Sequence, residues 1–297
     1  MIAISQSVDK FYYLNWVPSE SGLVVTDYGD IKSKGFDLLE DEHAFNEVLG
    51  QIIKNINVDE RILSLSLDKN NFIFSSIYID KNDSDLFDWY KMQMKDSFLN
   101  EKMDYYYYPF AKNSVKILSI SIPKSIRATI KQNMESLHAC LNNLSTGIFS
   151  AENGARAWFN ADQLKNYVIW KFGNNKQDEI LLINGNELSS YLSISRSNGK
   201  VNINWQLGED EEKTILCDYI EDLMSKGKIK KSPFEKIYVY SCDGKVEDIK
   251  KFQKKDEKKI VLLNPFSVLN MIQANKVNLY DTLPFAETGN AFRGIDV

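Results

Sequence analysis

The stretch that decides the fold is ILLINGNELSSYLSISRSNGKVNINWQLGED, residues 180–210. It opens with the apolar run 180–183, and a short apolar run closed by a turn such as 184–186 is typical of a buried strand. Apolar residues then alternate with serines over 190–194 and with polar residues over 201–205, the period of half-buried strands. The stretch therefore predicts three consecutive strands joined by tight turns.

The N-terminal part of the chain has the same order of elements. Residues 1–5, 11–16 and 23–28 have the composition and spacing of three strands. The apolar positions of residues 45–56 recur every three or four residues, which predicts an amphipathic helix, and 61–67 predicts a fourth strand. Because a helix and a strand also follow residue 210, the sequence contains the unit of three strands, helix and strand twice.

We therefore expect an α/β protein in which two mixed sheets are flanked by helices. This order of elements resembles the duplicated actin-like (ribonuclease H-like) fold. The predicted halves are residues 1–166 and 167–297, and a subdomain at about 81–150 is inserted in the first half. The expected elements of this middle part are strands at 71–79, 102–110 and 114–122 and helices at 85–99, 126–144 and 151–158. The expected elements of the C-terminal part are a charged helix at 245–255, a strand at 260–263 and a final helix at 283–293.

Composition excludes several classes of function. The net charge is -5 and the pI is about 5.3, so the chain has no general attraction to nucleic acid. No apolar run approaches the length of about 18 residues that a membrane span needs, and the N-terminus has no signal-peptide pattern. The cysteines Cys140, Cys217 and Cys242 have no paired spacing, which argues against a zinc site or disulfides. We expect a cytoplasmic protein.

The duplicated unit resembles the actin-like ATPase superfamily. In that fold the turn after each first strand holds nucleotide phosphates through backbone N–H groups, and an Asp at the end of each first strand organises the magnesium. The resemblance is closer to the PilM family of type IV pilus assembly proteins. It is carried by residues 61–94, by 117–129 (ILSISIPKSIRAT), by 262–266 (LLNPF) and by the tail 285–296 (FAETGNAFRGID). The cytoplasmic domain of the secretion protein GspL has a related fold.

The resemblance implies a nucleotide site at three turns, but the residues there depart from the pattern. The corresponding positions are Gln6 and Ser7 in the first turn, Asn184 and Gly185 in the second, and Cys242, Asp243 and Gly244 in the adenosine turn. The first turn has neither the Asp nor the Gly, the second has an uncharged Asn, and the third has one Gly. We expect a degenerate site, with no cofactor or only weakly bound ATP and magnesium. No residue is predicted to bind a metal, and none is predicted to be catalytic. Asp68 is the one candidate acid, and a turn role is favoured for it.

The resemblance also implies partners. A PilM-like protein is an adaptor that lies at the inner membrane and binds the cytoplasmic N-terminal tail of a single-span PilN-like protein as an extended peptide. A homodimer is left open. The alternative function is an active actin-like ATP-binding protein or ATPase. The family's helical lid over the base is expected to be shortened or absent, since only residues 208–235 separate the second strand triplet from the adenosine strand.

Two surface features have alternative interpretations. The tyrosines 105–108 could form a binding patch, but a half-buried strand is favoured. The lysines of residues 226–231 and 250–259 could face anionic lipid, but acidic residues interleave with them, and a solvated surface is favoured.

Overall fold

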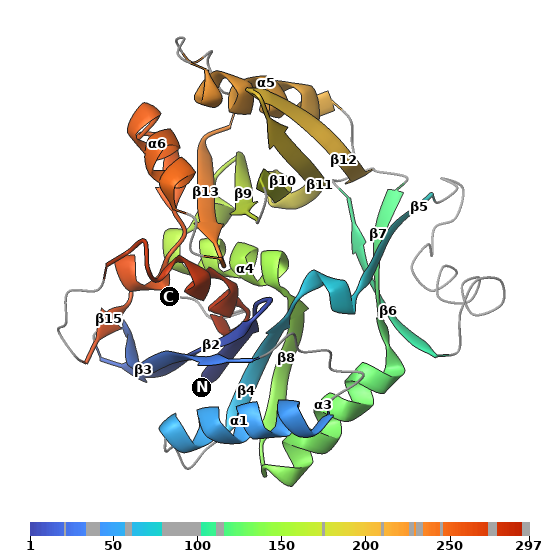
Figure 1. The fold of residues 1–297 in the computed structure, drawn as a ribbon, viewed down its shortest axis with the longest axis vertical. Helices are drawn as coiled ribbons and strands as arrows, with labels where there is room; N and C mark the ends of the chain where they lie inside the picture. Colours follow the sequence, from blue (N-terminus) through green and yellow to red (C-terminus); the bar gives the residue numbers. More distant parts are fainter. Residues whose placement is uncertain are drawn as a thin grey trace.

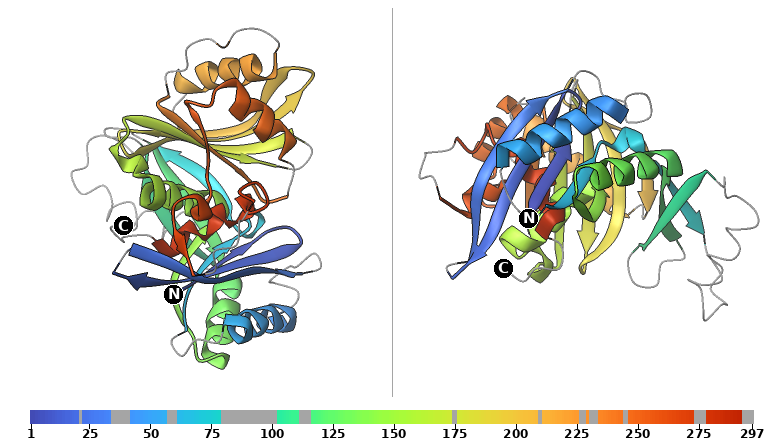
Figure 2. Two further views of the ribbon diagram at one scale, coloured as in Figure 1. Left: turned by 90° about the vertical axis from the view of Figure 1, so that its left-hand side faces the viewer. Right: turned by 90° about the horizontal axis from the view of Figure 1, so that it is seen from below.

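The computed structural model describes residues 1–20, 22–33, 42–56, 61–78, 102–110, 116–173, 176–208, 211–225, 229, 234–243, 246–272 and 278–292. These residues form two six-stranded sheets and one three-stranded sheet. Figure 2 shows the two large sheets one above the other, with helical segments between them and on both outer faces. No helix of these residues is long and apolar enough to cross a membrane.

The first sheet confirms the predicted N-terminal unit. Its strand order is β15-β3-β2-β1-β4-β8. The bounds of its strands are β1 Ile2–Gln6, β2 Lys10–Ser19, β3 Gly22–Lys32, β4 Ile62–Leu67, β8 Cys140–Thr146 and β15 Asn270–Met271. The central strand β1 pairs with β2 antiparallel and with β4 parallel. A parallel pair needs a crossover, which α1 (Glu42–Ile56) supplies between β3 and β4.

The core below the first sheet forms because α1 and α3 (Lys124–Ser136) each bury one apolar face against it (Figure 1). Alternate residues of β1, Ile2 and Ile4, point into this core, and Phe45 and Ile130 meet them from the two helices. The intervening residue Ala3 belongs to the other core, which extends from the space between the two large sheets to the outer face of the second sheet.

The second sheet has the order β12-β11-β10-β9-β13-β14. The bounds of its strands are β9 Asn166–Phe172, β10 Gln177–Asn184, β11 Glu187–Ser197, β12 Lys200–Gly208, β13 Lys236–Ser241 and β14 Ile260–Leu262. The helices α5 (Glu211–Met224) and α6 (Glu247–Lys255) cover its outer face, and α4 (Gly147–Phe159) lies between the two large sheets (Figure 1). Among the described residues, α5 is the one helix between β12 and β13.

The three strands predicted from residues 180–210 are β10, β11 and β12, but their place in the duplicated unit differs from the prediction. The strand that pairs antiparallel on one side and parallel on the other is β9, which pairs with β10 and with β13. Since β1 has the same two kinds of neighbour, β9 is the counterpart of β1. The second unit therefore begins one strand earlier than the sequence pattern indicated.

The inserted subdomain contains a three-stranded antiparallel sheet in the order β5-β7-β6, with bounds Ile73–Tyr78, Lys116–Pro123 and Met103–Pro109. Its expected limits of about 81–150 are wrong, because β5 already lies in this sheet and β8 lies in the first sheet. The helix expected at 126–144 is also shorter. It ends at Ser136, His138 has a positive φ of 50°, and β8 pairs parallel with β4. The helix expected at 85–99 lies outside the described residues.

The C-terminal segment returns to the first half, although it was expected within a second half of residues 167–297. The short strand β15 pairs with β3. The tail forms a 3-10 helix, η5 (Leu283–Phe292), whose residues are all buried against α4, β1 and β4. Its approach to α4 is very close, because a Cβ on Gly289 would meet the carbonyl oxygen of Ser150 at 2.3 Å. The tail therefore lies between the two sheets and contacts both halves.

Candidate functional site

The parallel strands of both sheets end where the two halves of the protein meet, and ligands of α/β proteins usually bind at such strand ends. We call this junction the cleft. In the first half these ends are Gln6 of β1 and Leu67 of β4, and in the second half they are Phe172 of β9 and Ser241 of β13. The Tyr12 hydroxyl of β2 donates to the Cys242 carbonyl oxygen at 3.4 Å and so joins the two ends. The cleft is therefore the candidate site.

The predicted residues of the first and third turns lie at these strand ends, and their polar groups form hydrogen bonds with other groups of the protein. The Gln6 amide oxygen accepts from the Asp68 backbone N–H at 3.2 Å and from Asn71 at 3.1 Å. The Ser7 N–H donates to the Lys10 carbonyl oxygen at 2.7 Å.

In the third turn, the Ser241 hydroxyl lies 2.5 Å from an Asp243 carboxylate oxygen. Burial raises the pKa of the Cys242 thiol well above its usual value, and Glu287 raises it further. Gly244 lies outside the described residues. Asp68 accepts from the Asn70 N–H at 2.9 Å and caps the short 3-10 helix η1 (Lys69–Asn71), in keeping with the favoured turn role.

The second predicted turn is at the wrong end of the sheet. Asn184 at the end of β10 pairs with Asn166 at the start of β9, whereas Ser241 pairs with Phe172 at the other end of β9. Gly185 and Asn186 both have positive φ, 58° and 68°, which is typical of a two-residue hairpin turn. Asn184 and Gly185 therefore do not meet the other predicted site residues, because β10 runs antiparallel to β9.

The turn at the correct end follows β9 and was not predicted. It begins at Gly173, whose N–H donates to an Asp178 carboxylate oxygen at 3.2 Å. A Cβ on Gly173 would meet the Gln177 carbonyl oxygen at 1.9 Å, so the chain turns back too tightly for a side chain. The same carboxylate group accepts from the Trp170 indole N–H and from Arg196, and it is fully buried.

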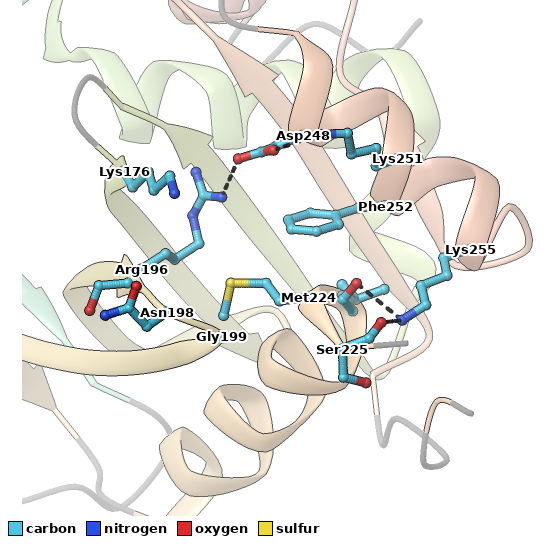
Figure 3. Close-up of a pocket in the computed structure, with 12 residues that line it drawn as sticks. Lys176, Arg196, Asn198, Gly199, Met224, Ser225, Asp248, Lys251, Phe252 and Lys255 are labelled. Atoms are coloured by element: carbon cyan, nitrogen blue, oxygen red, sulfur yellow. Dashed lines mark hydrogen bonds and ion pairs between the residues drawn. The ribbon is translucent and has the colours of Figure 1, made fainter. Parts of the chain in front are cut away.

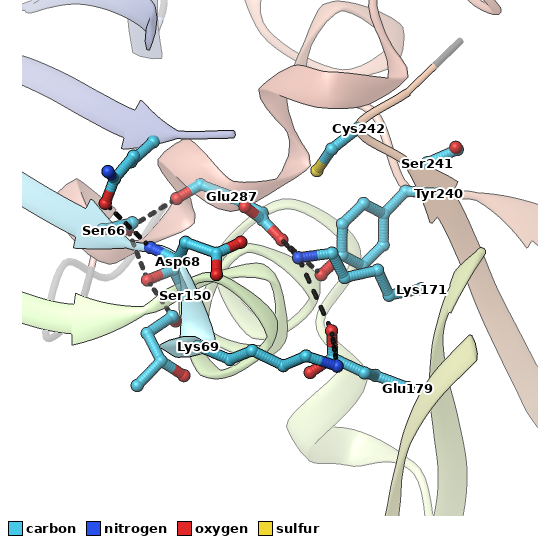
Figure 4. Close-up of polar contacts among 12 residues, drawn as sticks. Ser66, Asp68, Lys69, Ser150, Lys171, Glu179, Tyr240, Ser241, Cys242 and Glu287 are labelled. Carbon is cyan, nitrogen blue, oxygen red and sulfur yellow. Dashed lines mark hydrogen bonds and ion pairs between the residues drawn. The ribbon is translucent and has the colours of Figure 1, made fainter. Parts of the chain in front are cut away.

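At the cleft lie four charged side chains of alternating sign, which we call the charge chain: Lys69, Glu179, Lys171 and Glu287 (Figure 4). The Lys69 amine lies 3.2 Å from Glu179, the Lys171 amine 3.8 Å from Glu179 and 2.7 Å from Glu287. The exposed fraction of the side chain is 38% for Lys69, 7% for Glu179, 12% for Lys171 and 1% for Glu287. The chain of charges thus runs from the surface into the core.

Tyrosine hydroxyls complete the hydrogen bonding of the two carboxylates. The Tyr191 hydroxyl donates to Glu179 at 2.6 Å and the Tyr240 hydroxyl donates to Glu287 at 2.9 Å. Burial alone would raise the pKa of Glu179, but Lys171 and Lys69 outweigh it, so the pKa lies below its usual value. Burial would lower the pKa of Lys171, and the Glu287 carboxylate outweighs that effect, so the amine stays protonated.

The sequence carried a signal for the two most buried members of the charge chain. Lys171 interrupts the apolar run of residues 167–172, and Glu287 interrupts the largely apolar run 283–292. A charge within an otherwise buried element needs a partner of opposite sign. The pattern could have flagged both residues, but it could not show that they pair with each other.

A cavity of about 490 Å³ lies on the outer side of the second sheet between the β11–β12 turn, the end of α5 and α6 (Figure 3). Two of its cations, Arg196 and Lys255, already have partners. Arg196 pairs with Asp178 at 2.6 Å and with Asp248 at 2.8 Å, and its guanidinium lies 4.8 Å from the Phe172 ring centroid. The Lys255 amine donates to carbonyl oxygens at the end of α5. These contacts tie α6 to the sheet and to α5.

The described part of the chain contains no group of three or more His, Cys, Asp or Glu side chains placed to hold a metal ion. Two of the carboxylates at the cleft, Glu179 and Glu287, are each bound to lysine and to a tyrosine. A magnesium ion there would have to displace these contacts.

Comparison with known proteins gives matches among solved structures. No family model and no curated protein matches the chain. A chain in the structure of the PilM–PilN type IV pilus biogenesis complex aligns with a TM-score of 0.67 at 10% identity, over 100% of this chain and 98% of that one. The cytoplasmic domain of EpsL, an inner-membrane component of the type II secretion system of Vibrio cholerae, aligns with a TM-score of 0.45 at 10% identity, over 96% and 93%.

A Bacteroides thetaiotaomicron protein of unknown function with an actin-like ATPase fold aligns with a TM-score of 0.40 at 10% identity, over 91% of each chain. The last two likenesses are too distant to carry an argument, and identities this low show the fold and not the activity. The duplicated sheets, the crossover helices and the match to the pilus complex agree along the whole chain. The protein therefore has the actin-like α/β fold, and it shares that fold along its full length with a chain of the PilM–PilN complex.

Proposed function

We propose that the protein is an adaptor of an inner-membrane assembly platform for type IV pili or type II secretion. It works on the cytoplasmic side, binds the cytoplasmic tail of a single-span PilN-like membrane protein, and does so without nucleotide. The observation that carries the proposal is the likeness to a chain of the PilM–PilN complex, which covers both chains almost completely.

The contents of the cleft support a scaffold over an ATPase. Phosphates in this fold are held by backbone N–H groups of the turns after the first strands. Here the N–H groups of Ser7 and Gly173 donate to Lys10 and Asp178 of the same chain. Phosphoryl transfer also depends on a held metal ion and a positioned water, and the carboxylates of Glu179 and Glu287 already bind lysine and tyrosine.

One observation favours the alternative, an ATP-binding protein. Lys171 lies in the cleft, and a lysine amine can bind a phosphate. Isothermal titration with ATP and magnesium distinguishes the two functions. The adaptor predicts no heat of binding for the wild type. The ATP-binding function would be favoured if the wild type bound ATP with a Kd of about 10 µM or below. That binding should then be lost in Lys171→Met and kept in the surface control Lys131→Met.

The partner tail needs a surface that accepts an extended peptide, and the inserted sheet offers one. Among the described strands, β6 has β7 as its one neighbour in the sheet. Its residues Tyr106 and Tyr108 are 41% and 36% exposed, and tyrosines are enriched in interfaces. An extended tail can add to such an edge through main-chain hydrogen bonds, with side-chain pockets giving specificity. We place the docking site on β6.

The test is the binding of a labelled peptide that carries the cytoplasmic N-terminal tail of the PilN-like protein from the same genome. We expect the wild type to bind it and Tyr106→Ser to bind at least about tenfold more weakly, as for an interface anchor. Ile203→Ser, at an equally exposed position on the edge strand β12, is the matched control and should bind like the wild type. No binding by the wild type would refute the adaptor. Equal binding by Tyr106→Ser would place the docking site elsewhere.

A further inference from the structure

The charge chain contains two ion pairs that link the two halves of the protein. In one pair the lysine belongs to the first half, and in the other the lysine belongs to the second half. Lys69 follows β4 of the first sheet and pairs with Glu179 of β10 in the second sheet. Lys171 of β9 in the second sheet pairs with Glu287 of η5. We infer that these two ion pairs form a clasp that holds the halves closed around the cleft, at the place where an actin-like fold would hold nucleotide phosphates.

Glu287 is attached to the first half by hydrogen bonds between its segment and β4. The Ser66 hydroxyl of β4 donates to the Glu287 carbonyl oxygen at 2.8 Å, and the Asn290 amide donates to the Leu65 carbonyl oxygen at 3.2 Å. The carboxylate also lies directly against the start of α4, because a Cβ on Gly147 would meet its atoms at 2.4 Å. An opening of the two halves would therefore pull Glu287 away from Lys171.

The clasp is electrically balanced, with two cations and two anions. Glu179 receives two ammonium groups and a tyrosine hydroxyl, and Glu287 receives one of each, so closing the cleft leaves none of the buried charges without a partner. The hydroxyls of Tyr191 and Tyr240 come from the second half. A nucleotide with magnesium would join the halves through contacts to both, and the clasp makes the equivalent contacts with the protein's own side chains.

Cys242 reports whether the clasp is closed. It lies at the end of β13, its residue is 8% exposed, and its carbonyl oxygen accepts from Tyr12 of the first half. Cys217 on α5, within the second half, is partly exposed, and Cys140 is exposed. Separation of the halves would expose the Cys242 thiol and leave the surroundings of Cys217 unchanged, whereas global unfolding would expose both.

The experiment measures the modification rate of each cysteine by a thiol reagent, resolved by mass spectrometry, for the full chain and its variants. Lys69→Met removes the half-exposed end of the clasp and Glu287→Gln removes its buried end. Lys10→Met is the matched control, because the Lys10–Asp30 ion pair at 2.9 Å lies within the first sheet. We expect the Cys242 rate, normalised to Cys217, to rise about 5–20-fold in Lys69→Met, as local opening becomes easier. The rise should be larger in Glu287→Gln, where loss of the carboxylate also lowers the pKa of the Cys242 thiol. Lys10→Met should stay within about twofold of the wild type.

Three results would overturn the clasp. The first is an unchanged Cys242 rate in Lys69→Met, which decides the matter even if Glu287→Gln does not fold. The second is a rise in Cys242 matched by an equal rise in Cys217, which indicates global unfolding. The third is protection of Cys242 in the wild type by ATP and magnesium, which would mean that nucleotide joins the halves.

Discussion

The Lys171 amine lies 2.7 Å from a carboxylate oxygen of Glu287, and both side chains are almost fully buried. The pair joins a strand in the centre of the second sheet to the C-terminal segment that packs on the first. Two charges in such a place are costly to desolvate, and each depends on the other for compensation. The pair therefore makes predictions that differ from those of a surface ion pair.

Removal of one member of this pair should destabilise the protein strongly. Glu287→Gln leaves the buried Lys171 ammonium without its main partner, and such a loss typically costs about 3–5 kcal/mol of unfolding free energy. Urea unfolding followed by circular dichroism measures the change. Lys131→Met, which removes a solvated helix pair with Glu135, should cost less than about 1 kcal/mol. Equal costs for the two variants would mean that the buried pair is not formed in solution.

The effects of Lys171→Met and Glu287→Gln on the unfolding free energy should be strongly non-additive. Each single variant leaves one buried charge without its partner, whereas the double variant removes both charges. The double variant should therefore be destabilised by at least about 1 kcal/mol less than the sum of the single variants. A double-mutant cycle from the same urea curves gives this coupling energy. Simple additivity would argue against direct contact.

The unfolding free energy should decrease in acid because the Glu179 carboxylate becomes protonated. The pKa of Glu179 in the folded protein is below its usual value of 4.5, so the carboxylate contributes stability that is complete above about pH 4.5. That contribution disappears as the pH falls through the lower folded value, because the proton then binds the native state as well. The difference in unfolding free energy between the wild type and Glu179→Gln should therefore narrow below pH 4.5. A difference that stays constant from pH 7 to pH 3 would contradict the contacts of Glu179 with Lys171 and Lys69.

The approach of η5 to α4 should not tolerate a methyl group. A Cβ on Gly289 would lie 2.3 Å from the Ser150 carbonyl oxygen and 2.4 Å from the Gly154 nitrogen, and backbone atoms cannot move aside cheaply. Gly289→Ala should lower the melting temperature, with a loss of about 1–3 kcal/mol from overpacking. Gly50→Ala is the control, because its Cβ would meet nothing nearer than 3.8 Å within α1, and it should stabilise by about 0.5–1 kcal/mol. The prediction fails if both variants shift the melting temperature in the same direction.

Asn184→Asp should not create binding of ATP and magnesium. The residue sits in a hairpin turn at the end of β9 opposite to Ser241, so a carboxylate there is remote from the cleft. Isothermal titration should give no heat for this variant. Binding that appears with Asn184→Asp would mean that the strand-end geometry described for the second sheet is not the one in solution.

Much of the fold could be predicted from the sequence because the decisive patterns are local. Short apolar runs and the alternation of side chains between two faces identified β1, β2 and β3 and the later β10, β11 and β12, and the helical period identified α1. The duplication followed from the order of these elements. Each of these predictions depends on residues within a few positions of one another, where periodicity is a direct consequence of backbone geometry.

The tertiary structure decided which element some segments form and where each element lies. Residues 140–146 fit a helical period as well as a strand, and pairing with β4 made them β8. The turn at Asn184 looks the same whether it holds a phosphate or closes a hairpin, and the antiparallel direction of β10 settled which end of the sheet it occupies. Lys171 and Glu287 are visible in the sequence as isolated charges in apolar segments, but only the return of the tail between the sheets brings them together. Strand direction and long-range pairing are set by contacts between distant segments, and no local pattern encodes them.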